Sequence, residues 1–266
     1  MNLNGKVAIV TGASRGMGKP MALRLATHGA RMVIAARTLD ESGSGLPGSL
    51  SQTAAEIRAL GADVTAVKCD LTVRSEVENL CKRALDAYGR IDVVVNNARL
   101  FGKGYMDPFL DIDIDTWERH IYANFTSCII ISRLSIPSMI ENGSGMIVNI
   151  TSGAAIHEMP AMPGNGSTSA CYPATKAALN RFTGSLAKEM RPYGIPVIAL
   201  DPGATKTEYA TLEVPKYGFD TSRNHSMDIP AAALEYLICD CPDPMTYTGQ
   251  VLVAKDLVER HHLLTA

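Results

Sequence analysis

Two residues whose side chains can move a proton, Tyr172 and Lys176, stand four positions apart in the segment CYPATKAAL. Residues at i and i+4 lie on the same face of a helix. An ammonium group beside a phenol favours the phenolate and lowers the pKa of the phenol from a reference of about 10. Such a pair can give or take a proton near neutral pH. The spacing alone is common on ordinary helix surfaces, so it indicates a catalytic pair only if the surrounding segments support that function.

A glycine-rich turn follows the first apolar run of the chain. Val7 to Val10 leads into TGASRGMG (11–18), and a helical pattern continues from Gly16 to His28. Glycines permit a tight turn here and let a diphosphate approach the N-terminus of the helix. The spacing G-x-x-x-G-x-G also suits a plain tight turn, but its place between a strand and a helix favours a dinucleotide site. The residues expected to form that site are Gly12, Ser14, Arg15, Gly16, Met17 and Gly18.

The residues after the second apolar run indicate which dinucleotide binds. A site for NAD usually places an acidic residue there, which holds the ribose 2′-hydroxyl. Here the chain reads AART (35–38), and the first carboxylate is Asp40. Arg37 and Arg15 are two guanidinium candidates for a 2′-phosphate, although each could be an ordinary solvated arginine. The sequence therefore favours NADP(H) as the cofactor and leaves NAD(H) possible.

Composition excludes several other classes of protein. The chain has 266 residues, 46% of them apolar and 20% charged, with a formal net charge of −2, so we expect no nucleic-acid partner and no binding to an anionic membrane. The six cysteines are scattered, and Cys239-Asp240-Cys241 lacks the companions of a metal site, so we expect reduced thiols and no metal. No signal-peptide pattern opens the chain and no apolar run reaches a membrane span. These features predict a cytoplasmic protein.

Short apolar runs alternate with longer amphipathic stretches along the chain. The expected strands are Val7 to Val10, Arg31 to Ala35, Val64 to Lys68, Ile91 to Val95, Met146 to Ile150, Pro196 to Leu200 and Gln250 to Val253. The expected helices are Gly16 to His28, Ser51 to Leu60, Arg74 to Tyr88, Asp115 to Ile140, Tyr172 to Arg191 and Ala231 to Cys239. Continuous apolar strands indicate burial on both faces. The alternation predicts an α/β fold: a doubly wound parallel sheet (Rossmann fold) of seven strands with helices on both faces. Because no linker or change of composition occurs, residues 1–266 are expected to form one NAD(P)-binding domain.

Two long irregular segments are expected at the carboxyl ends of strands, where open α/β sheets bind ligands. They are His157 to Ala170 and Ala204 to Asp228. Loops of this length are usually functional or disordered, and we expect both to wall a substrate site. Their apolar side chains suggest an adaptable pocket, although they could equally pack against each other without ligand. These side chains are Met159, Met162, Tyr209, Leu212, Tyr217 and Phe219.

Taken in order, these motifs resemble those of the short-chain dehydrogenase/reductase family over essentially the whole chain. The matching segments are TGASRGMG (11–18), CDLT (69–72), NNA (96–98), Asn124 within its helix, NITS (149–152), YPATK (172–176) and DPGATKT (201–207). The resemblance implies an oxidoreductase that transfers a hydride between nicotinamide and a carbonyl or secondary alcohol. It also implies a small-molecule substrate and a homo-oligomer, either a tetramer or a dimer.

The resemblance assigns a role to each matching residue. Tyr172 would be the general acid/base, and Lys176 would lower its pKa and hold the nicotinamide ribose. Ser152 would hydrogen-bond the substrate oxygen, and Asn124 would hold a water in the proton relay. Further cofactor contacts would come from Asp70 and Leu71 at the adenine, Asn97 and Ala98 beside the adenosine half, and Pro202, Gly203, Thr205 and Thr207 at the nicotinamide end.

Taken singly, three of these polar residues have ordinary structural explanations. Asn124 could be a mid-helix polar residue, Ser152 a cap at a strand end, and Asp70 a helix N-cap. Only the ordered set favours catalysis.

The chain departs from the family pattern at three places. The family's NNAG reads NNAR here, and the charge of Arg99 could reach the cofactor phosphates or the mouth of the substrate site. The separation of Ser152 and Tyr172 is several residues longer than usual, so the excess is expected to bulge within the loop before Tyr172. The tail after the last strand lacks the usual glycines, which could alter an oligomer contact. Arg99 keeps an alternative open: a non-catalytic dinucleotide-binding protein that acts as a redox sensor or partner subunit.

Overall fold

A parallel sheet forms the centre of the molecule. The computed structural model describes residues 1–40, 45–158, 161–162, 166–167 and 169–264. Within these residues the sheet has seven strands in the order β3-β2-β1-β4-β5-β6-β7, and each neighbouring pair is parallel. The strands are β1 Val7–Thr11, β2 Arg31–Ala36, β3 Val64–Lys68, β4 Val93–Asn96, β5 Met146–Ile150, β6 Val197–Asp201 and β7 Val251–Val253. The doubly wound sheet expected from the sequence is confirmed.

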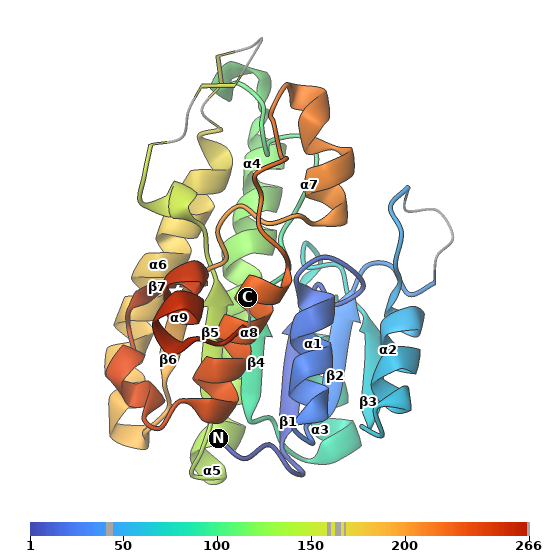
Figure 1. Cartoon of the computed structure of the whole chain (residues 1–266), viewed down its shortest axis with the longest axis vertical. Helices are drawn as coiled ribbons and strands as arrows, with labels where there is room; N and C mark the ends of the chain where they lie inside the picture. The colour runs from blue at the N-terminus through green and yellow to red at the C-terminus, as the bar shows by residue number, and fades with distance from the viewer. Residues whose placement is uncertain (41–44, 159–160, 163–165, 168, 265–266) are drawn as a thin grey trace.

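Helices cover both faces of this sheet (Figure 1). One face carries α1 Gly18–Thr27, α2 Leu50–Ala59, α8 Asp228–Glu235 and α9 Ala254–His261. The other carries α3 Arg74–Tyr88, α5 Ser127–Glu141 and α6 Cys171–Met190. Figure 1 shows α7 Glu208–Leu212 and the start of α4 Ile114–Ile121 above the carboxyl ends of the strands. Open α/β sheets bind their ligands at this edge.

The first strand shows why its sequence forms the centre of the sheet. All five residues of β1 are buried. Val7 and Ile9 face the cluster that contains α3, α5 and α6, whereas Ala8 and Val10 face the cluster that contains α1, α2 and α8. Side chains alternate between the faces of a strand, so a strand covered on both faces must be apolar throughout.

A long helical stretch spans Ile114–Glu141 and includes a π-helical turn at Tyr122–Thr126. By length and composition alone, an 18-residue window of this stretch could cross a membrane. Half of that window is buried in the fold, and α5 packs against α3 and β4. These contacts are those of a core helix.

Several boundaries differ from the expected ones for physical reasons. The first helix begins at Gly18 and not Gly16, because Gly16 has a φ of +57°, outside the helical region. The helix expected from Ala231 begins three residues earlier, at Asp228. The short helices α7 and α9 were not expected.

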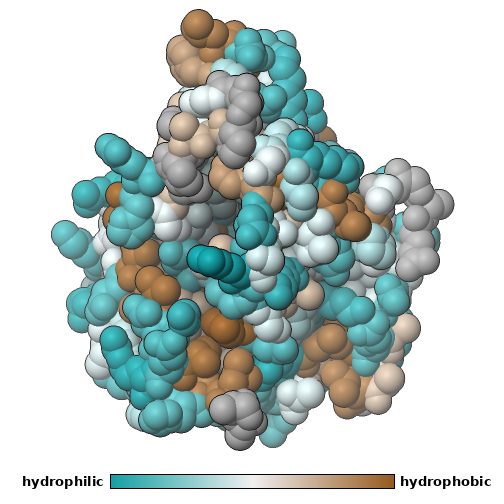
Figure 2. All heavy atoms as spheres, turned by 45° about the horizontal axis from the view of Figure 1, so that its top comes forward, coloured by the Kyte–Doolittle hydropathy of each residue, from teal (hydrophilic) through white to brown (hydrophobic). Residues whose placement is uncertain are grey.

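Exposed apolar side chains gather at the end of the molecule that carries α4. Phe109, Leu110 and Ile114 are all exposed there, and Figure 2 shows apolar surface at this end. The ring of Phe109 meets that of Trp117 edge-on at 5.9 Å.

Candidate functional site

The turns that follow β1 and β4 meet where the strand order reverses. Asn97 Nδ2 donates a hydrogen bond to Thr11 O at 2.7 Å, and the backbone N atoms of Asn97 and Ala98 each donate to Thr11 Oγ1 at 3.0 Å. In doubly wound sheets this switch point is the crevice in which nucleotides bind. Asn97 thus braces the two turns against each other.

The glycine-rich turn has a backbone conformation and a close packing that require glycine. Gly12 has a φ of +71° and Gly16 of +57°, both in the left-handed region that favours glycine. A Cβ on Gly18 would lie 2.3 Å from Gly12 O and 2.6 Å from Asn97 Nδ2. Only glycine fits at Gly18, and the resulting cradle suits a diphosphate at the start of α1. Ser14 is buried and Met17 immediately precedes α1.

Sequence reasoning missed a carboxylate on this turn. Glu208, the first residue of α7, accepts a hydrogen bond from Gly16 N through Oε2 at 2.8 Å. Thr207 caps the same helix and accepts from Ala210 N at 3.1 Å. No spacing in the sequence signals this contact, because it joins segments 192 positions apart. The carboxylate occupies a donor that a phosphate oxygen would otherwise use.

The two arginines expected at the 2′-phosphate lie near each other. Arg15 Nη2 donates to Gly48 O at 2.6 Å, and Arg37 is exposed directly after β2. Burial lowers the pKa of Arg15, and the positive charge of Arg37 lowers it further, whereas Glu208 raises it. Asp40 Oδ1 accepts a hydrogen bond from Ser51 Oγ at 2.5 Å.

Asp70 and Leu71 lie at the carboxyl end of β3, on the same edge of the sheet. Asp70 Oδ1 accepts from Thr72 N at 2.9 Å and from Thr72 Oγ1 at 2.8 Å, and Asp70 N donates to Glu76 Oε2 at 2.7 Å. Leu71 is buried. The carboxylate therefore shapes the turn into α3.

Asn124 lies in the π-helical turn between α4 and α5. Its Oδ1 accepts from Leu100 N at 2.8 Å, and its Nδ2 donates to Thr175 Oγ1 at 3.3 Å. Thr175 Oγ1 donates in turn to Tyr172 O at 2.8 Å. Asn124 thereby links the segment after β4 to the first turn of α6, and π-helical turns often mark functional positions.

Lys176 is a cation buried beside the phenol of Tyr172. Its side chain is 2% exposed, its Nζ donates to Ile150 O at 2.7 Å, and Nζ lies 6.0 Å from the centroid of the Tyr172 ring. Burial lowers the pKa of Lys176 to about 8; Cys128 opposes this effect and Arg99 adds to it. The pKa of the Lys176 ammonium therefore lies much closer to neutral pH than that of an ordinary lysine.

Ser152 and Tyr172 approach from neighbouring elements. Ser152 follows β5, and its Oγ accepts from Ala154 N at 3.2 Å, which caps a short 3₁₀ turn packed against α6. Tyr172 is the second residue of α6, with Pro173 in the first turn, where a missing N–H is tolerated. The ring of Tyr105 meets that of Tyr172 edge-on at 5.0 Å.

The residues after β6 form a tight turn that leads to α7. Gly203 has a φ of +68°, and its N donates to Asp201 Oδ1 at 3.0 Å. Thr205 Oγ1 lies 3.2 Å from the carbonyl oxygens of Pro202 and Gly203, to which it can donate. This turn brings Thr207 beside Gly16, where a Cβ would lie 3.7 Å from Thr207 Cγ2.

The two long loops reach the same end of the molecule. Ser167 Oγ donates to Asp107 O at 2.8 Å, and Ser169 Oγ donates to Tyr105 O. Tyr209 is buried against Phe101, with ring centroids 4.1 Å apart. The other side chains expected in an apolar pocket differ in burial: Met162 is buried, Tyr217 and Phe219 are half-buried, Leu212 is exposed, and Met159 lies outside the described residues.

Arg99 takes the place of the family glycine without adopting a left-handed backbone; among the described residues, only Ser169 and His262 do so without being glycine. Its guanidinium carbon lies 3.9 Å from the ring centroid of Phe101, 4.2 Å from that of Tyr105 and 5.0 Å from that of Tyr172. The side chain of Arg99 therefore lies beside Tyr172.

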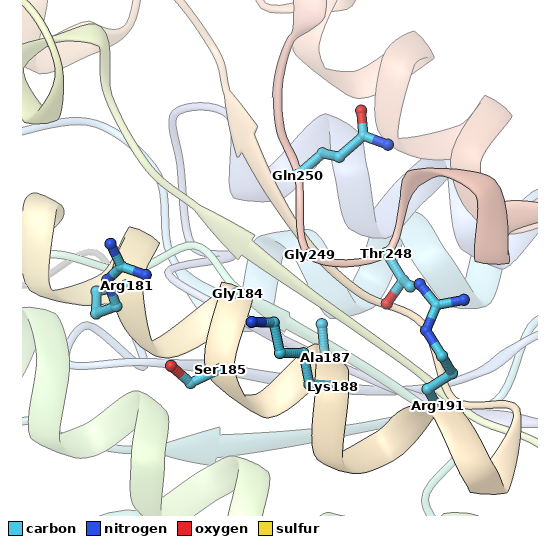
Figure 3. A pocket seen from close by; sticks show the side chains of 9 residues that line it. All are labelled: Arg181, Gly184, Ser185, Ala187, Lys188, Arg191, Thr248, Gly249 and Gln250. Carbon is cyan, nitrogen blue, oxygen red and sulfur yellow. The ribbon is translucent and has the colours of Figure 1, made fainter.

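A separate hollow of about 320 Å³ lies between the second half of α6 and the residues before β7 (Figure 3). Figure 3 shows Arg191 pointing toward Thr248. The hollow exists because glycines face each other there: a Cβ on Gly184 would lie 3.6 Å from Gly249 O. None of the residues that line it belongs to the motifs that carry the expected chemistry.

Comparison with known proteins supports the same family. A family model described as short chain dehydrogenase matches residues 6–217. An uncharacterized oxidoreductase of Thermotoga maritima is 34% identical over 205 residues, which cover 77% of this chain and 73% of that protein. A metagenomic short-chain oxidoreductase crystallised with NADP has a TM-score of 0.65 and 32% identity, covering 76% of this chain and 84% of its own. A short chain dehydrogenase from Burkholderia cenocepacia, also in complex with NADP, has a TM-score of 0.76 and 28% identity, covering 95% and 97%.

The chain belongs to the short-chain dehydrogenase/reductase family, and it is an oxidoreductase of that family.

Proposed function

We propose that this protein is an NADP(H)-preferring oxidoreductase that interconverts a carbonyl compound and a secondary alcohol, with Tyr172 as the general acid/base. The observation that carries the proposal is the buried ammonium of Lys176, 6.0 Å from the ring of Tyr172 and with a pKa lowered to about 8. A buried cation next to a phenol stabilises the phenolate form, which favours transfer of the phenolic proton to and from the substrate oxygen.

The residues fit a nicotinamide dinucleotide, because the glycines keep the turn before α1 tight and two arginines lie near the end of β2. Gly12, Ser14, Gly16, Met17 and Gly18 would hold the diphosphate, and Arg15 and Arg37 the 2′-phosphate. Asp70, Leu71, Asn97 and Ala98 would line the adenosine half, and Pro202, Gly203, Thr205 and Thr207 the nicotinamide end. When bound, the cofactor supplies the hydride or accepts it.

Tyr172 and Ser152 would then act on the substrate oxygen, and Lys176 and Asn124 would support them. In reduction, Tyr172 Oη gives its proton to the carbonyl oxygen, and in oxidation it takes the proton of the alcohol. Lys176 Nζ stabilises the phenolate, and Ser152 Oγ donates a hydrogen bond to the substrate oxygen. Asn124 holds the segment after β4 against α6 and so positions Tyr172 and Lys176.

We further propose that residues 1–266 act as one unit in which residues 157–170 and 204–228 wall the substrate site. Their hydrogen bonds to the segment after β4 and to Gly16 support this placement. The family membership supports a homo-oligomer, which size-exclusion chromatography with light scattering can measure.

Initial rates of NADPH oxidation with a panel of ketones and aldehydes test the enzymatic function. The wild type should turn over, and Tyr172→Phe should lose activity by about two to four orders of magnitude while still binding NADPH. Tyr88→Phe, in α3 and away from the site, is the matched control. NADPH binding without turnover, unchanged in Tyr172→Phe, would instead support the redox-sensing or partner function that the sequence left open.

A further inference from the structure

Arg99 is a charged side chain that the family reaction does not use, placed against the residue that the reaction depends on. Its guanidinium is surrounded by four aromatic rings: Phe101, Tyr105, Tyr172 and Tyr209, at 3.9, 4.2, 5.0 and 6.0 Å from the guanidinium carbon to each ring centroid. The rings also contact one another, so the guanidinium fills the centre of an aromatic cage. Such cages hold cations by interaction with the ring faces.

Among the residues that the structure describes, no carboxylate pairs with Arg99. Within the described residues, Asp and Glu form ion pairs with other basic groups, and none of these pairs includes Arg99. Its Nη1 atom is buried and lacks a hydrogen-bond partner in the same part of the chain. The guanidinium also hydrogen-bonds with the side chain of Tyr105, but a buried ionic donor such as Nη1 is costly while it lacks an acceptor.

The surroundings of Arg99 keep its guanidinium charged. Burial by itself lowers the pKa of Arg99, but the phenols of Tyr105, Tyr172 and Tyr209 outweigh it, so the pKa lies above its ordinary value. Arg99 in turn contributes to lowering the pKa of Lys176. Two basic side chains therefore face the phenol of Tyr172, and neither has an acidic partner in the described structure.

We propose that Arg99 binds a carboxylate of the substrate, so that the substrate is an oxo acid in the reducing direction and a hydroxy acid in the oxidising direction. The inference rests on the proposed function, because it places the substrate's reacting oxygen at Tyr172. The planar guanidinium fork matches the two oxygens of a carboxylate. Because Arg99 lies beside Tyr172, the carboxylate is separated from the reacting carbon by a short spacer, as in a 2-oxo or 3-oxo acid.

Kinetics with paired substrates test this assignment. Each 2-oxo or 3-oxo acid is compared with its methyl ester, which keeps the carbonyl and removes the charge. The wild type should favour the acid, and Arg99→Gln should lower the acid-to-ester ratio of kcat/KM by about a hundredfold. Arg99→Lys, which keeps the charge without the fork, should fall between them. Arg83→Gln, an exposed arginine of α3, should keep the wild-type ratio. A wild type that favours esters, or an Arg99→Gln ratio equal to that of the wild type, overturns the assignment.

Calorimetric titration with oxalate, without cofactor, gives a readout that needs no turnover. The wild type and Arg99→Lys should bind oxalate, and a folded Arg99→Gln should bind it at least tenfold more weakly; equal binding overturns the assignment. Tighter binding of inorganic phosphate than of oxalate would overturn the choice of a carboxylate. If oxalate binding depends on Arg99 but no carbonyl compound is reduced, the anion site stands and the proposed reaction fails.

Discussion

Replacing Lys176 with methionine tests whether the buried ammonium carries the energetic penalty that its surroundings imply. At pH 7 the lysine is protonated in both the folded and the unfolded chain, and the folded state bears the full cost of burying the charge. Between about pH 8 and 10.5 the folded lysine has lost its proton while the unfolded one retains it. The unfolded state then binds more protons, so the free energy of unfolding of the wild type rises with pH through this window.

The size of this rise follows from the two pKa values. One pKa unit is worth about 1.4 kcal/mol, so the difference between 10.5 and about 8 amounts to about 3 kcal/mol. About 2 kcal/mol of it should develop between pH 7 and pH 9.5. Lys176→Met has no such group, and the titrating side chains that do not interact with Lys176 cancel in the difference.

The assay is urea unfolding of both proteins at several pH values between 7 and 9.5. The difference in unfolding free energy between wild type and variant should move by about 2 kcal/mol in favour of the wild type as the pH rises. Lys188→Met, an exposed lysine on the same helix, is the matched control, and its difference from the wild type should stay flat. A flat difference for Lys176→Met would refute the buried-charge reasoning.

Three further substitutions test the cofactor cradle. Arg37→Ala should weaken NADPH binding by about tenfold, since about 1.4 kcal/mol of phosphate pairing is lost, and should leave NADH binding within twofold; equal losses in a titration of both cofactors would contradict the 2′-phosphate role. Glu208→Gln should tighten NADPH binding by about threefold to tenfold, because it removes a negative charge from the hydrogen bond to Gly16 N; weaker binding in the same titration would show that Glu208 assists the cofactor. Gly18→Ala should lower both the melting temperature and the affinity for NADPH, because its Cβ would lie 2.3 Å from the rigid Gly12 O; a wild-type melting curve and titration would contradict the cradle.

Apolar patterns in the sequence predicted the sheet because a strand covered on both faces must be apolar along its length. Apolar patterns do not fix where a helix or strand begins and ends, because the backbone conformation of the terminal residues decides that. Gly16 continued the helical pattern but has a left-handed φ, so α1 begins two residues later. The short helix α7 was not predicted, because its five residues hold few positions that a period could reveal.

The candidate site also has a part that could be predicted from the sequence and a part that could not. Spacing predicted that Tyr172 and Lys176 share a helix face, and the family resemblance added Asn124, which hydrogen bonds now link to Tyr172 through Thr175. Spacing could not show that Arg99 turns toward Tyr172, because that direction depends on aromatic side chains from three segments. The contact of Glu208 with the glycine turn was equally hidden, since it depends on how a distant loop folds back.

The most direct test of the central claim follows the transferred hydrogen itself. Wild-type protein is given NADPH that carries deuterium in the transferable position at C4 of the nicotinamide, together with a carbonyl substrate found in the panel, and the product is analysed by mass spectrometry. We predict an alcohol with one deuterium on the carbinol carbon, formed by the wild type and not, within the same time, by Tyr172→Phe. An alcohol without deuterium, or equal formation of the labelled alcohol by Tyr172→Phe, would contradict hydride transfer assisted by Tyr172.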